Sequence, residues 1–241
     1  MLLFDLPENT PCSLCNRPLT GTVARDPTGQ YLCASHVGRA RQCRFCDRAF
    51  LPAQGRESTC SKCVSHAVTS ETAVSAQRDL VSHWFLQHGL RLPRTLPEIV
   101  LRRELPPSPL LRGTRMLGYV ESRRDFWGHE TSHIVMERGL PAALACAVLT
   151  HELGHILIAT HRLALPTWAE EGSCEWLAHR FLGTLRTAES LIQQHRIERR
   201  QDPTYGVGFQ WVLSRLKHGD PHALIPLLQS HWSPSCVNAF Q

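Results

Sequence analysis

The sequence lacks a segment that would carry it into or across a membrane. Residues 1–10 contain Asp5 and Glu8, and no basic stretch precedes an apolar core, so they do not fit a secretory signal. The richest apolar stretch, 141–150, is too short to span a bilayer. Charge of one sign is also scarce, since 26 Lys and Arg oppose 21 Asp and Glu and leave a net charge of +5. We therefore expect a soluble, cytoplasmic protein without a membrane partner.

Low-complexity tracts are also missing, and no internal repeat extends beyond short cysteine pairs. Apolar residues make up 42% of the chain and charged residues 20%, which excludes a disordered chain, a collagen or a pure disulfide miniprotein. A length of 241 residues predicts one or two domains with a sizeable core. Cysteine and histidine are unusually frequent, with ten and fourteen residues.

Seven of the ten cysteines lie close to the N-terminus, in pairs that share a two-residue internal gap. Such a gap lets both side chains face one ion, so two pairs make one tetrahedral zinc site. Zinc is favoured over disulfides, which are rare in the cytoplasm, and over simple core cysteines. We predict two structural zinc ions, paired sequentially rather than in a crossed order. The pairs are, in chain order, Cys12 with Cys15, Cys33 with His36, Cys43 with Cys46, and Cys60 with Cys63.

This cysteine-rich segment predicts a first domain over residues 1–68. It has eight basic and five acidic residues, and the thiolates of two loaded sites bring its charge close to zero. A neutral module lacks the excess positive charge that a nucleic-acid binder needs, so we expect no nucleic-acid partner. A closed four-ligand site supplies folding energy, and we expect a role in binding a protein partner.

The rest of the chain has the pattern of a second, larger domain. A connecting helix is predicted over 69–90, where Ser70 can cap the helix and Gly89 can end it. The domain at 91–241 starts with short strands and continues with helices. The predicted strands are 99–105, 116–121 and 133–137, and the predicted helices are 141–160, 168–185, 188–199, 206–217 and 223–228.

The chemical signature of the second domain is an HExxH sequence on its first, strongly apolar helix. His151 and His155 are four residues apart, so both imidazoles project from one helix face and can hold one zinc ion. Glu152 lies beside that face and can reach a water molecule on the metal. A buried structural helix with two partnered histidines is the competing interpretation.

A third ligand would complete a catalytic zinc site with one open position. The next helix begins after Pro166 and offers both Glu170 and Glu171, which point about 100° apart. Glu175 lies one turn after Glu171. It is either the carboxylate that orients a ligand histidine or an exposed helix acid.

These segments together resemble the LIM-associated, ubiquitin-activated "DA-one" peptidases of plants and their bacterial relatives. The resemblance runs from about Cys12 to Phe209. Its most specific parts are the Glu-Glu-Gly-x-Cys-x-x-Leu-Ala-His segment at 170–179 and the Tyr-Gly-x-Gly-Phe segment at 205–209, together with the paired cysteine units. Glu171 is selected as third ligand because Glu-Gly here is similar to the third-ligand segment of gluzincin metallopeptidases.

The resemblance implies an α+β protein. A small two-zinc LIM-like or zinc-ribbon module would precede a helix-rich, gluzincin-like metallopeptidase domain with a small sheet. We expect one catalytic and two structural zinc ions, and a protein or peptide substrate. Glu152 would act as general base, and Tyr205, expected in a glycine-flanked turn, would stabilise the oxyanion. The strand at 133–137 is expected to pair with an extended substrate or to be ordinary sheet structure.

The main alternative from another class is a catalytically silent LIM-type adaptor. A cysteine peptidase would need a base beside Cys146 or Cys174, which we interpret as buried core cysteines.

Overall fold

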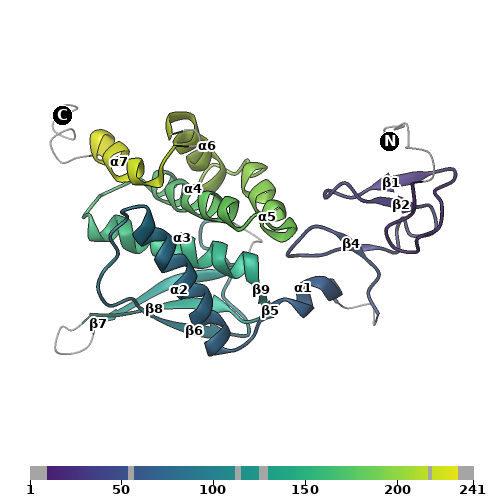
Figure 1. Ribbon diagram of the computed structural model, residues 1–241, viewed down its shortest axis with the longest axis horizontal. Helices are drawn as coiled ribbons and strands as arrows, with labels where there is room; N and C mark the ends of the chain where they lie inside the picture. Colours follow the sequence, from purple (N-terminus) through teal and green to yellow (C-terminus); the bar gives the residue numbers. More distant parts are fainter. Residues whose placement is uncertain (1–9, 54–56, 112–114, 125–129, 217–218, 233–241) are drawn as a thin grey trace. The chain divides into compact units, whose positions relative to one another are not determined.

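The computed structural model describes residues 10–53, 57–111, 115–124, 130–216 and 219–232. Over these residues the chain is a mixed α/β protein with small sheets, which confirms the coarse prediction (Figure 1). Its contacts divide it into two compact units between His66 and Ala67. The boundary predicted from the sequence lies at residue 68, and the predicted connecting helix is part of the second unit.

The first unit is built from two short antiparallel hairpins and one short helix. In the first hairpin Val23 pairs with Cys33, and in the second Arg41 pairs with Phe50. The elements are β1 (Val23–Arg25), β2 (Tyr31–Cys33), β3 (Arg41–Gln42), β4 (Ala49–Phe50) and α1 (Ser61–Ser65).

The two Cys-x-x-Cys turns repeat one backbone geometry. The amide of Asn16 donates to the carbonyl of Cys12 at 2.8 Å, and the amide of Asp47 donates to that of Cys43 at 2.9 Å. Asn16 and Asp47 have φ values of 58° and 59°, in the left-handed region that Asn and Asp tolerate better than other side chains. The residue after each pair therefore closes the turn that aims both sulfurs at one point.

The first unit has little apolar core of its own. Among its described residues, the buried hydrophobic side chains other than cysteine are Leu32 and Phe45. Asp26 adds a polar tie, because its carboxylate accepts from the amide of Gln30 in the first hairpin and from that of Ala49 in the second, at 2.9 and 2.8 Å. Metal ligation would supply further cohesion to such a unit.

The second unit holds the longer helices and a three-stranded sheet. Ser70 caps α2 by accepting from the amide of Ala73, and Gly89 follows with φ of 66°, so both predicted helix signals are confirmed. The predicted helices and strands are all present, with ends shifted by a few residues. The elements are β5 (Ala67–Val68), α2 (Glu71–Gln87), β6 (Glu98–Arg102), β7 (Gly118–Arg124), β8 (Glu130–Glu137), β9 (Leu140–Pro141), α3 (Ala142–Thr160), α4 (Thr167–Leu185), α5 (Ala188–Glu198), α6 (Tyr205–Leu216), the 3-10 turn η1 (Pro221–Ala223) and α7 (Leu224–Trp232).

The order of the sheet is β6-β8-β7, with β8 parallel to β6 and antiparallel to β7. β8 contains the predicted strand at 133–137, and it is the central strand. The expectation that this strand pairs with a substrate is wrong, because both of its edges already bond to neighbouring strands. Ile134, Val135 and Met136 are buried, as a central strand requires.

Helix α3 is the centre of the second unit. It packs against the sheet on one side and against α4 on the other (Figure 1), so it is apolar nearly all round. Among the described residues it is the one helix long and apolar enough to cross a membrane, and two thirds of that stretch is buried inside the fold. The apolar stretch is therefore longer than the segment 141–150 indicates. It continues past His151, His155 and Glu152, because Glu152 is the one Asp, Glu, Lys or Arg within α3.

Glycines set how closely the site-bearing helices approach each other. A Cβ at Gly154 of α3 would lie 2.9 Å from the sulfur of Cys174 on α4. A Cβ at Gly172 of α4 would lie 2.1 Å from the backbone of Gly208 on α6. Gly172 and Gly208, from the segments 170–179 and 205–209, thus meet where α4 crosses α6. Because these glycines and Gly154 have no side chain, α3, α4 and α6 can pack closely together.

Candidate metal centres

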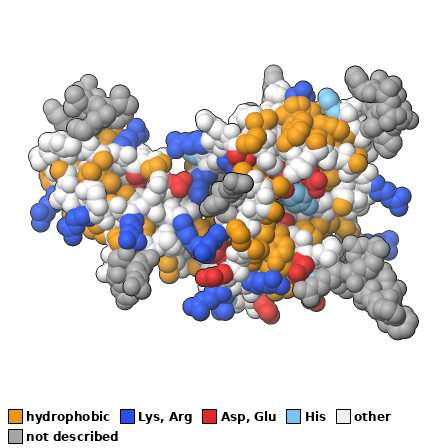
Figure 2. All heavy atoms as spheres, turned by 180° about the vertical axis from the view of Figure 1, so that it is seen from behind, with side chains coloured by type: hydrophobic (Ala, Val, Ile, Leu, Met, Phe, Trp, Pro, Cys, Tyr) orange, Lys and Arg blue, Asp and Glu red, His pale blue; other side chains and the backbone are white. Residues whose placement is uncertain are grey.

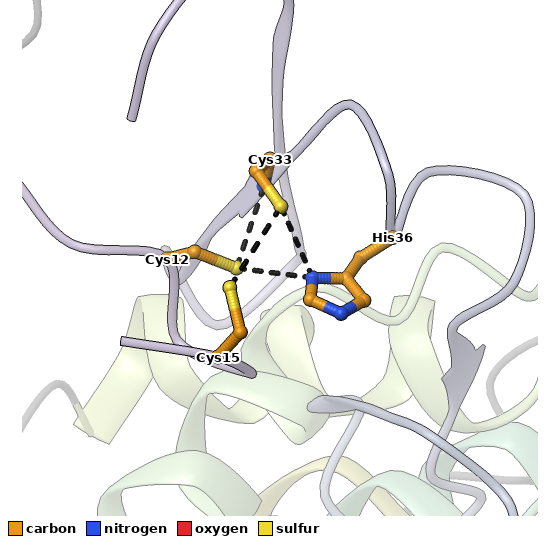
Figure 3. A group of neighbouring side chains, drawn as sticks. All are labelled: Cys12, Cys15, Cys33 and His36. Carbon is orange, nitrogen blue, oxygen red and sulfur yellow. Dashed lines mark hydrogen bonds between the residues drawn. The ribbon is translucent and has the colours of Figure 1, made fainter. Parts of the chain in front are cut away.

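The first cluster of the N-terminal unit joins the first two pairs. Figure 3 shows the side chains of Cys12, Cys15, Cys33 and His36 pointing toward one another. The Nδ1 atom of His36 lies 3.3 Å from the sulfur of Cys12 and 3.2 Å from that of Cys33. Donors around a tetrahedral zinc lie about 3.3–3.8 Å apart, so this set fits zinc with Nδ1 as the histidine ligand.

The second cluster contains Cys43, Cys46, Cys60 and Cys63, all buried. The sulfurs of Cys46 and Cys60 are 3.7 Å apart. The clusters therefore combine successive pairs, and the predicted sequential order is confirmed.

Backbone amides point at the sulfur of Cys12 and favour its charged form. The amides of Cys33 and Leu14 point at the sulfur of Cys12, at 3.4 and 3.5 Å. Burial alone would raise the pKa of the Cys12 thiol, but the amides of Cys33, Leu14 and Cys15 together with the His36 side chain outweigh it and lower the pKa to about 6. A thiolate is the form that binds a metal.

The second unit brings His151, His155 and Glu171 together in a triangle. The Nε2 atoms of the two histidines are 3.2 Å apart. One carboxylate oxygen of Glu171 lies 3.0 Å from Nε2 of His151 and 3.6 Å from Nε2 of His155. These edges match the spacing of about 3.3 Å between nitrogen and oxygen donors on a tetrahedral zinc.

Two more carboxylates of α4 lie behind the histidines. Glu170 contacts Nδ1 of His155 at 2.8 Å, and Glu175 lies 3.9 Å from Nδ1 of His151. Each carboxylate faces the ring nitrogen that points away from the triangle. Glu170 is at hydrogen-bond distance and orients the ring of His155, whereas Glu175 is a charged neighbour of His151 beyond that distance. Glu170, which the residue pattern left as an alternative ligand, therefore lies on the far side of His155. Glu175 is buried, so it is not an exposed helix acid.

Glu152, on α3, is buried beside the triangle and faces the start of β7. One of its carboxylate oxygens would lie 3.2 Å from a Cβ at Gly118, so Gly118 leaves the space that this carboxylate uses. Burial raises the pKa of Glu152, and the nearby histidines oppose that shift. Sequence reasoning did not single out Gly118, although a glycine at the start of a strand signals close approach.

Tyr205 also lies at the centre. Its ring centroid is 6.0 Å from that of His151. Burial and the Glu171 carboxylate raise the pKa of Tyr205 to about 12, so its hydroxyl keeps its proton at neutral pH. The predicted glycine-flanked turn is wrong, because Tyr205 is the first residue of α6.

Cys174 is the unexpected member of this region. Its sulfur lies within 4.8 Å of ring nitrogens of His151 and His155, so these three residues also form a group that could hold a metal. Cys174 is fully buried, and burial raises the pKa of its thiol to about 11. A thiol that stays protonated and inaccessible is a poor nucleophile, so a histidine beside it does not make a cysteine peptidase.

The histidine centre is accessible from outside the second unit. The side chains of His155 and Glu170 are 22% and 35% exposed, whereas Cys174 is inaccessible. Figure 2 shows one face of the molecule, on which histidine and acidic side chains lie among groups of hydrophobic side chains. The partial exposure of His155 and Glu170 gives a ligand access to the centre.

Comparisons of the chain with models of known protein families, with curated proteins and with solved structures found no match, so its function is inferred from its own residues and geometry.

Proposed function

We propose that this chain is a zinc-dependent endopeptidase that hydrolyses peptide bonds of protein substrates. The second unit would be a gluzincin-like catalytic domain. The first would be a LIM-like module with two structural zinc ions, which binds a partner or regulates activity. The resemblance to the DA-one peptidases supports this proposal, as does the donor triangle. We further propose a cytoplasmic location.

The observation that carries the proposal is the convergence of His151, His155 and Glu171 with Glu152 beside them. Three protein donors would leave the fourth position of a tetrahedral zinc to water and substrate, unlike the four-residue cysteine clusters. Zinc held there would acidify a water molecule and polarise the scissile carbonyl.

Glu152 would move the proton. Its carboxylate accepts a proton from the attacking water and passes it to the nitrogen of the leaving amine. The Tyr205 hydroxyl, protonated at neutral pH, would donate to the oxygen of the attacked carbonyl.

The edges of the sheet suggest where a substrate lies. Among the described strands of this sheet, β6 and β7 each pair on one side only, and β7 is the one whose first residue, Gly118, abuts Glu152. An extended peptide added along β7 would bring a peptide bond to the Glu152 carboxylate. We therefore propose β7, in place of β8, as the strand that aligns the substrate.

The test is Glu152→Gln in the full chain. We expect three zinc ions per chain in both forms, because this substitution leaves the three ligands of the histidine centre intact. Cleavage of a proteome-derived peptide library should fall by about 10³-fold or more, since the general base is lost. Glu104→Gln is the matched control, because Glu104 is an exposed glutamate outside the centre. Zinc is measured by elemental analysis and cleavage by mass spectrometry.

A wild-type chain that holds three zinc ions and cleaves nothing in that library would contradict the proposal and favour the non-catalytic adaptor. Equal cleavage by wild type and Glu152→Gln would also contradict it. Two zinc ions per chain would remove either the histidine centre or one cysteine cluster from the assignment.

A further inference from the structure

Arg200 makes three contacts that no sequence motif predicted. It lies in the loop between α5 and α6. One guanidinium nitrogen is 2.7 Å from a carboxylate oxygen of Glu175, and another is 3.1 Å from the carboxylate of Asp202. The carbon at the centre of the guanidinium is 4.1 Å from the ring centroid of Tyr205. The Arg200 side chain thus contacts both Glu175, which lies next to His151, and Tyr205.

The contact with Glu175 continues to the metal ligands. The side chain of Glu175 is 10% exposed, and the same oxygen that Arg200 contacts lies 3.9 Å from Nδ1 of His151. A buried carboxylate needs a partner of opposite charge. The guanidinium fixes the orientation of Glu175, and Glu175 faces the ring whose other nitrogen belongs to the donor triangle.

The contact with Tyr205 is reinforced through the backbone. Asp202, which binds Arg200, also accepts from the amide of Tyr205 at 2.7 Å. A Cβ at Gly206 would lie 2.4 Å from the carbonyl oxygen of Arg200, so the loop is packed tightly on the first turn of α6. The planar guanidinium stacks on the Tyr205 ring from this anchored loop.

We propose that Arg200 is a positioning residue with two separable effects. Through Glu175 it holds His151 in the geometry that retains the metal, and through its stack on Tyr205 it holds the phenol that assists hydrolysis. The second effect rests on the proposed peptidase function, whereas the first concerns metal retention and does not require turnover.

The first experiment follows the transfer of zinc from the full chain to a chromophoric chelator. The release phase of the histidine centre is identified by its absence in His155→Ala. We expect Arg200→Ala to release this zinc about threefold to tenfold faster, because a partner behind a ligand contributes about 10–100-fold in affinity and Arg200 lies one step further away. Arg200→Lys should release it near the wild-type rate, since lysine still supplies a charge to Glu175. The neighbouring exposed Arg199→Ala is the matched control.

The second experiment measures kcat and KM on a cleaved peptide. Arg200→Ala should lower kcat about tenfold with little change in KM. Arg200→Lys should not restore kcat, because an ammonium has no planar face to stack on the ring. In a Tyr205→Phe background, the effect of Arg200→Ala on kcat should become smaller than in the wild type, which a double-mutant cycle detects.

Zinc release from Arg200→Ala at the rate of Arg199→Ala would overturn the first effect. Full additivity in the cycle with Tyr205→Phe would overturn the second. If no peptide is cleaved, the release rates still decide the Glu175 effect while the peptidase proposal fails.

A second set of variants is used if Arg200→Ala does not fold, as judged by thermal unfolding. Glu175→Gln then replaces it in the release assay, and a wild-type release rate from Glu175→Gln would contradict the proposal. For the stacking effect, Arg200→Lys then takes the place of Arg200→Ala in the kcat measurement and in the cycle, and a wild-type kcat in Arg200→Lys would contradict it.

Discussion

The two units of this chain differ in how much apolar core surrounds their candidate metal clusters. In the first unit, buried cysteines make up most of the core, and Leu32 and Phe45 are the other buried hydrophobic residues described there. In the second, α3 and α4 pack through a large apolar core, and His151, His155 and Glu171 project from helices that this core already holds. The first unit would need a bound metal to stay folded, whereas the second unit would be folded before a metal binds. A closed cluster suits a structural metal, and a centre with three protein donors would suit the catalytic role proposed above.

The largest expected effect is Cys63→Ser, which removes one ligand of the all-buried cluster. The chain should lose at least one zinc, and the first unit should unfold, because structural zinc contributes about 10 kcal/mol or more of folding free energy in small domains. The second unit should keep its helical circular dichroism. Ser61→Ala, an exposed change in the same helix, is the control. A first unit that keeps a dispersed NMR spectrum after Cys63→Ser would break the comparison.

A smaller effect separates the two donors that compete for the histidine centre. Glu171→Ala should speed zinc release from this centre about 100-fold or more, because it removes a direct ligand. Cys174→Ala should leave the release rate near that of the wild type. Both variants should keep the second unit folded, as its core predicts. The reverse pattern of release rates would identify Cys174 as the third ligand and contradict the assignment of Glu171.

The smallest effect tests whether helix packing positions the open centre. Gly172→Ala should lower the free energy of unfolding of the second unit by about 2 kcal/mol, because its Cβ meets backbone of Gly208 that cannot retreat. Gly183→Ala makes the same substitution later in α4, where the Cβ meets the flexible end of Gln194. This control should be neutral or slightly stabilising, since alanine favours helix. Urea unfolding measures both, and equal stability of the two variants would show that this crossing tolerates a side chain.

Some features of the site could be predicted from residues alone because they depend on local geometry. The gap between paired cysteines aims both side chains at one point, and the spacing of His151 and His155 places both rings on one helix face. Ser70 and Gly89 mark helix ends for reasons that involve only neighbouring backbone groups. Such features can be predicted from the sequence because they depend only on residues that are close together in the chain.

Other features depend on which elements pack together, and only the tertiary structure decided them. Glu170 and Glu171 are adjacent and alike, and the approach of α4 to α3 decides that Glu171 joins the triangle while Glu170 lies behind His155. The central place of β8, the position of Cys174 beside His155, and the contacts of Arg200 follow from the same packing. Sequence spacing determines the face on which a side chain lies, but the neighbour that it meets is set by the close approach of helices at Gly154, Gly172 and Gly208.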